Sequence, residues 1–126
     1  DKRAALEEIL PEAFATVREA VPFPVNAIDS PSLRLLAAWT TDLDGEPAAV
    51  LAYRWNDRLV MQYVVSEQLF FRPSEMRRVF ADGRHLAARS GAQSLIAWPA
   101  MGSGELLVGD VGIERLAALR PASARR

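Results

Sequence analysis

The feature that most constrains this fold is a pair of apolar runs, residues 48–55 and 58–65, separated by Asn56 and Asp57. Both runs are rich in β-branched and aromatic residues, which favour strands, and the two residues between them tolerate the positive φ of a tight turn. The pattern therefore predicts a β-hairpin with a type I′ turn, in which Trp55 pairs with Arg58.

This register divides the hairpin into two faces, because successive side chains of a strand point to opposite sides. The first face is apolar except for Arg54, whereas the second also carries Arg58 and Gln62. The apolar members of the first face are Ala48, Val50, Ala52, Leu59, Met61, Tyr63 and Val65, and those of the second are Ala49, Leu51, Tyr53, Trp55, Val60 and Val64. We expect the first face to pack on the core, and a helix or a partner surface to cover part of the second.

An amphipathic helix is expected at the start of the chain, where apolar residues recur at helical spacing between Leu6 and Val17. Proline inside a helix removes a hydrogen bond and clashes with the preceding turn. The sequence therefore predicts a short helical piece before Pro11 and a main helix from Pro11 to about Ala20. Residues 21–25 contain two prolines and read as an extended connector.

The rest of the chain reads as further strands and short helices. A strand at 33–41 and a turn at 42–46 extend the hairpin into a meander, and Pro73-Ser74 is expected to start a short helix that ends at Asp82-Gly83. A fourth strand is expected at 84–89. The further expected elements are a second hairpin, 94–99 and 105–109, with a longer loop at 101–104, and a final helix from Ile113 that stops at Pro121.

These elements predict an α+β fold. Its antiparallel sheet has five or six strands built from two hairpins, and the N-terminal and C-terminal helices pack on it. With 126 residues, 50% of them hydrophobic, residues 1–126 are long enough to form a single domain with its own core.

Composition leaves few catalytic groups. The chain has no cysteine and one histidine, His85, so disulfides, a thiol nucleophile and thiolate metal sites are excluded. A net charge of −1 with interspersed charges argues against a nucleic-acid partner. We therefore expect no catalytic residue, no metal site and no cofactor, and we expect that the chain is not an enzyme.

Two short motifs resemble ion or phosphate sites. Asp42, Asp44 and Glu46 have the spacing that starts a calcium loop, but its twelfth position is Tyr53, where such a loop requires a bidentate glutamate. The glycines around Ser103 are not followed by the lysine of a phosphate-binding loop. Both stretches are therefore predicted to be turns.

Aromatic side chains are the remaining candidates for a binding surface, because they contribute strongly to pockets and interfaces. The candidate interaction or pocket residues are Trp39, Tyr53, Trp55 and Trp98.

The order of these features resembles a known family over about residues 21–119. The most distinctive part is the strand Ala49-x-x-x-Tyr53-Arg54, followed by the late Trp98 and a terminal helix. The segments that carry the resemblance are 22–25, 33–36, 45–54, 59–65, 96–98, 107–110 and 114–119. They are similar to the extracytoplasmic C-terminal domain of membrane-anchored bacterial anti-sigma factors.

The resemblance implies a periplasmic sensory or regulatory domain that is tethered to the inner membrane and controls an extracytoplasmic-function sigma factor. In that family a cytoplasmic domain holds the sigma factor and a single transmembrane helix crosses the membrane. Both lie outside these 126 residues, so we expect this chain to be one domain of a longer protein. The expected partners at the domain itself are a regulatory protease, a signal protein or ligand, or a second copy of the domain.

Two other functions remain open from the residues alone. A soluble small-ligand-binding domain would be favoured by a deep pocket lined by Trp39, Trp55 or Trp98. A small carboxylate-dependent hydrolase would be favoured by two carboxylates that converge in a cleft near His85.

Overall fold

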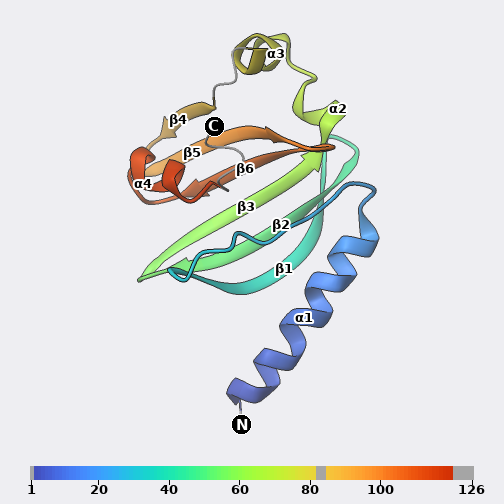
Figure 1. Cartoon of the computed structure of the whole chain (residues 1–126), viewed down its shortest axis with the longest axis vertical. Helices are drawn as coiled ribbons and strands as arrows, with labels where there is room; N and C mark the ends of the chain where they lie inside the picture. Colours follow the sequence, from blue (N-terminus) through green and yellow to red (C-terminus); the bar gives the residue numbers. More distant parts are fainter. Residues whose placement is uncertain (1, 82–84, 121–126) are drawn as a thin grey trace.

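The computed structural model describes residues 2–81 and 85–120, and its six strands form one antiparallel sheet in the order β1-β2-β3-β6-β5-β4 (Figure 1). The strands are β1 (Leu33–Leu43), β2 (Glu46–Trp55), β3 (Arg58–Ser66), β4 (Leu86–Ser90), β5 (Gln93–Ala100) and β6 (Ser103–Gly109). The helices are α1 (Lys2–Ala20), α2 (Glu67–Phe70), α3 (Ser74–Ala81) and α4 (Ile113–Ala118). The predicted α+β class and its antiparallel sheet are confirmed. Some predicted positions lie outside the described residues. They are the ends of two helices, at Asp82-Gly83 and at Pro121, and the start of the fourth strand, at Arg84.

Short turns organise the sheet into two meanders, β1-β2-β3 and β4-β5-β6, which are joined where β3 pairs with β6. The predicted pairing of Trp55 with Arg58 is confirmed. The type I′ turn predicted between them is wrong, because Asn56 has φ 57° whereas Asp57 is not among the described residues with positive φ. Both central residues of the β1–β2 turn, Asp44 and Gly45, have the positive φ that a type I′ turn requires, at 54° and 84°.

The second hairpin is tighter than its sequence suggested. Ala100 pairs with Ser103, so Met101 and Gly102 alone form the turn, and Gly102 has φ 79°. Pro99 still lies in β5, opposite Gly104. The four-residue loop predicted at 101–104 is therefore wrong, because a glycine with positive φ allows β5 to continue to Ala100 and β6 to begin at Ser103.

The larger core lies on the face that was expected to need an external cover. Tyr53, Val60 and Val64 of this inner face are each at most 1% exposed. They pack with Val17, Val25, Ile96, Trp98, Leu107 and Leu116 in one cluster. The prediction that the opposite, outer face forms the main core is wrong. It rested on the two polar residues of the inner face, Arg58 and Gln62, but the structure buries Gln62 in the inner core.

The inner face is closed by α1, by α4 and by the irregular chain between α1 and β1, residues 21–31, which we call the covering segment. Val21, Phe23, Val25 and Ile28 of this segment are buried. Its alternation of buried and exposed residues is that of an extended chain lying on a surface, in line with the predicted extended connector at 21–25.

Within the part of the chain that the structure describes, the outer face is covered at one end. There α2 and α3 place Phe70 and Phe80 over Ala48, Val65 and Ala97 in a second, smaller cluster. The rings of Phe70 and Phe80 lie 5.1 Å apart, centroid to centroid. Away from these helices, apolar side chains such as Trp39 and Leu59 remain exposed.

Helix α1 runs without a break from Lys2 to Ala20, with Pro11 in its interior. The predicted separation into two pieces is wrong, since the loss of one hydrogen bond at a proline can be tolerated when the turns on both sides keep theirs. Val17 anchors the C-terminal half in the inner core, while the N-terminal half extends away from the sheet (Figure 1). Among the described helices, none has both the length and the apolar composition needed to cross a membrane.

Candidate functional site

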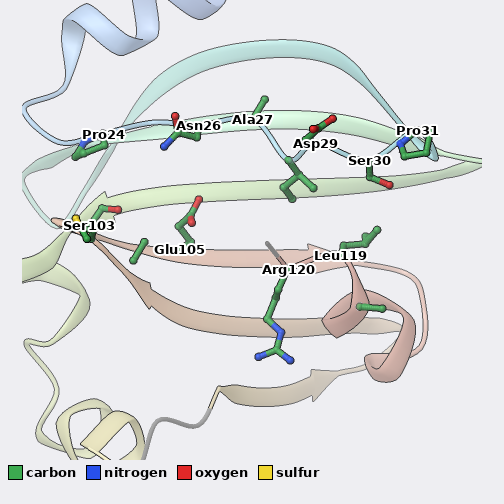
Figure 2. A pocket seen from close by; sticks show the side chains of 14 residues that line it. Pro24, Asn26, Ala27, Asp29, Ser30, Pro31, Ser103, Glu105, Leu119 and Arg120 are labelled. Carbon is green, nitrogen blue, oxygen red and sulfur yellow. The ribbon is translucent and has the colours of Figure 1, made fainter. Parts of the chain in front are cut away.

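A groove opens on the inner side of the sheet, between the covering segment, the β5–β6 turn and the end of α4 (Figure 2). Its volume is ≈ 650 Å³, within the range of small-molecule sites. The residues that line it are Pro24, Asn26, Ala27, Ile28, Asp29, Ser30, Pro31, Ala100, Met101, Ser103, Glu105, Ala118, Leu119 and Arg120. The lining of the groove therefore combines apolar side chains with polar and charged ones.

Under the groove lies a buried hydrogen-bond network centred on Gln62. The Gln62 amide nitrogen donates to the Glu105 carboxylate over 2.6 Å and to the Asn26 carbonyl oxygen over 3.1 Å. The Tyr53 hydroxyl donates to the Gln62 side-chain oxygen over 2.5 Å and accepts from the backbone N–H of Ile28 over 3.0 Å. The network thus ties the covering segment to strands β2, β3 and β6.

Strand register brings these side chains together. Gln62 pairs with Leu51 on β2 and with Leu107 on β6, so Tyr53 and Glu105 are its diagonal neighbours on the same face. A buried amide needs partners for both its N–H groups and its oxygen, and here each has one. The polar residue that interrupts the apolar pattern of β3 is therefore fully used inside the core.

Glu105 is the charged group of the network and is only 8% exposed. Burial raises the pKa of its carboxyl, because desolvation disfavours the charged form, while hydrogen bonds from Gln62 and Trp98 partly offset this rise. Burial also raises the pKa of Tyr53 to about 12, and the nearby Glu105 charge acts in the same direction. Tyr53 is therefore a neutral hydrogen-bonding group at physiological pH.

The four aromatic residues singled out from the sequence do not share one site. Tyr53 and Trp98 belong to the network under the groove, where Trp98 is 2% exposed and hydrogen-bonds Glu105. Trp55 borders a separate polar hollow of ≈ 390 Å³, together with three arginines, Arg58, Arg89 and Arg115. Trp39 lies on the outer face and is 41% exposed. None of the three tryptophans lines the groove itself.

Sequence reasoning did not select Gln62 or Glu105, the two residues at the centre of this arrangement. A signal was present, because Gln62 is a lone polar residue within an apolar run and Glu105 directly precedes another such run. Such an interruption marks either a solvent-facing position or a buried polar group, and the choice depends on which face is covered.

The groups considered for catalysis are scattered. His85 is not among the residues that line the groove, and its pKa is lowered by burial and by the nearby Arg120 charge. Asp29 and Glu105 are the two carboxylates of the lining. Among the described residues, no three His, Cys, Asp or Glu side chains are grouped so that they could hold a metal ion.

Comparison with known proteins gives no family assignment. No family model matches the sequence, and no curated protein matches it. Among solved structures, the chain is similar to a chain in the complex structure of Pseudomonas aeruginosa MucA/MucB, with a TM-score of 0.47 and 14% sequence identity. The alignment covers 74% of this chain and 34% of that one, so this chain spans about a third of the length of its neighbour.

Proposed function

We propose that this chain is the extracytoplasmic regulatory domain of a membrane-anchored anti-sigma factor, and that it acts by binding and not by catalysis. The observation that carries the proposal is the position of the residues behind the family resemblance. Tyr53 and Trp98, its most distinctive members, belong to the single network beneath the groove. The family-like residues therefore lie beneath the groove, which is the surface that we propose for binding.

The geometry of the groove supports the non-catalytic part of the proposal. Glu105 is held by Gln62 and Trp98, whereas Asp29 lies exposed on the covering segment. His85 lies outside the groove lining. General acid–base catalysis needs an acid and a base within hydrogen-bond reach of one reacting atom. In this lining, the carboxylate of Glu105 is buried and already hydrogen-bonded within the protein.

A route for a signal follows from the position of the covering segment. It borders the groove and leads directly into α1, and the Gln62 and Tyr53 side chains hold it on the sheet. In the full-length protein proposed here, α1 is the element nearest the upstream membrane helix. An occupant or a protease that displaces the covering segment would therefore change the anchoring of α1, and through it the hold on the sigma factor.

The test uses the full-length protein in its own bacterium. Protease added to spheroplasts, in which the outer membrane is opened and the inner membrane stays sealed, should cut within residues 1–126 while an upstream fragment stays protected. Deletion of these residues should change expression from a sigma-dependent reporter. As a matched control, the same cells should leave a cytoplasmic marker protein uncut. A chain that stays protected from external protease, or a reporter that does not respond to the deletion, would contradict the proposal.

A soluble small-ligand-binding domain is the second candidate, and the groove itself is the observation in its favour. The two candidates differ in membrane attachment. If the full-length protein appears in the soluble fraction, the ligand-binding function replaces the regulatory one.

A further inference from the structure

The groove has a polarity that selects among ligands. Its charged lining residues are Asp29, Glu105 and Arg120. The Arg120 guanidinium points away from the covering segment in Figure 2, its Nε donates to the Ala117 carbonyl oxygen over 2.9 Å, and its charge acts on His85. The Glu105 carboxylate, by contrast, points across the groove toward the covering segment. The charge presented to an occupant is therefore negative.

Apolar residues lie on both sides of this carboxylate. Figure 2 shows Glu105 between one end of the groove at Pro24 and Ser103 and the other end at Pro31 and Leu119. At the first end, the β5–β6 turn presents Met101, which is 93% exposed. A flexible thioether adapts to differently shaped apolar groups, and prolines give rigid apolar walls. The lining thus offers apolar contacts around a central negative charge.

The depth of Glu105 limits the shape of the charged group that can reach it. The residue is 8% exposed, and Ser103 beside the turn is 2% exposed. A slim group at the end of an apolar stem fits such a site, whereas a bulky ion such as a quaternary ammonium does not. An incoming cation also compensates a buried carboxylate whose charge is otherwise costly to desolvate.

From these observations we propose that the groove binds an organic cation, a primary ammonium or a guanidinium on an apolar stem, with its charge paired to Glu105. From this central charge the stem extends toward one end of the groove, at Pro24 or at Leu119, and Asp29 at the rim adds a weaker, solvent-screened attraction. Free amines and basic side chains of peptides share this chemistry. The site does not depend on the regulatory role proposed above, because binding to the isolated chain is measured directly.

The experiment titrates the 126-residue chain with pentylammonium chloride and follows backbone amide signals by NMR. We expect saturable shifts centred on residues 26–29 and 103–105, and a much smaller response to pentanoate or pentanol. Glu105→Gln should weaken binding by about tenfold or more, since it removes the charge and keeps the shape. The matched control Glu75→Gln, an exposed position on α3, should bind as the parent chain does.

Two further arms complete the test. A capped leucine–lysine–leucine tripeptide that binds more tightly than pentylammonium assigns the site to peptides, and equal affinity assigns it to free amines. If the Glu105→Gln chain does not fold, the pH dependence of the parent chain decides, because affinity should rise as Glu105 loses its proton. The proposal is overturned by absence of saturable binding, by equal binding of pentanoate, by unchanged affinity in folded Glu105→Gln, or by an affinity independent of pH.

Discussion

The two faces of the sheet are stabilised in different ways. On the inner face, a continuous apolar cluster surrounds a satisfied polar network, and three elements close over it. On the outer face, α2 and α3 cover one end, and the remaining apolar side chains include Leu59, which is 55% exposed. The face with more apolar residues in sequence is thus the less buried one, so coverage and not hydrophobic count decides where the core lies.

The largest effect is expected from removal of the centre of the inner network. Gln62→Ala leaves Glu105 without its amide donor and Tyr53 without its acceptor, both in a buried site. We expect a loss of about 3 kcal/mol in the free energy of unfolding, measured by urea denaturation. Gln93→Ala, at an exposed strand end, is the control and should change stability little. A similar small loss for both variants would show that the network does not stabilise the inner face.

On the outer face, the backbone of Gly104 packs closely against the side chain of Phe70. A Cβ atom at this position would overlap the ring of Phe70, which α2 holds against the sheet. Gly104→Ala should therefore cost about 2 kcal/mol, because the buried ring has to move. Gly112→Ala is the control, since no described atom lies within 4 Å of its added Cβ. Equal melting temperatures of the two variants would mean that α2 packs loosely.

Substitutions at two neighbouring residues of β3 allow the stability contributions of the two faces to be compared directly. Val60 points to the inner face and is fully buried, whereas Leu59 points to the outer face and is exposed. Val60→Ala should lower stability by about 1.5 kcal/mol and Leu59→Ala by less than about 0.5 kcal/mol, although leucine loses more atoms. A reversed order in thermal denaturation would indicate that a second molecule covers the outer face in solution.

The smallest effect is the pH dependence that Glu105 contributes on the inner face. Burial raises the pKa of Glu105 above its ordinary value of 4.5. Between the ordinary pKa, which applies to the unfolded chain, and the raised pKa of the folded chain, the folded chain holds the proton more strongly. Stability contributed by the protonated form is thus lost as pH rises through this window, by at most about 1.4 kcal/mol per pH unit. Glu105→Gln should remove this slope and Glu75→Gln should retain it. Parallel stability curves for the parent chain and Glu105→Gln would contradict the prediction.

Local features of the sequence were sufficient to predict that the strands exist and that the two hairpins pair strands adjacent in sequence. The Trp55 and Arg58 pair was predicted because two apolar strands and two turn residues leave a single register. The short helices at Ser74 and Ile113 were predicted from their spacing of apolar residues. These are local properties, and local propensity and turn chemistry determine them.

The choice of face and the site required information that no single segment contains. Gln62 is buried because residues 21–31, far away in sequence, cross the inner face and accept its hydrogen bond at Asn26. Glu105 becomes part of the groove because β6 inserts beside β3 and not next to β4. The sequence around Gln62 or Glu105 does not show that residues 21–31 lie over Gln62 or that β6 pairs with β3. Tyr53 and Trp98 were selected as aromatic, but their importance lies in the hydrogen bonds that they make.

The ladder between β3 and β6 also has a consequence for the order of folding. All other strand pairs join neighbours in sequence, so each meander can close its turns early and rapidly. The ladder ends where Ser66 meets Ser103, and its formation must bring together chain segments separated by α2, α3, β4 and β5. The inner network spans this ladder, with Gln62 on one side and Glu105 on the other. The groove therefore cannot form before the two halves of the chain meet.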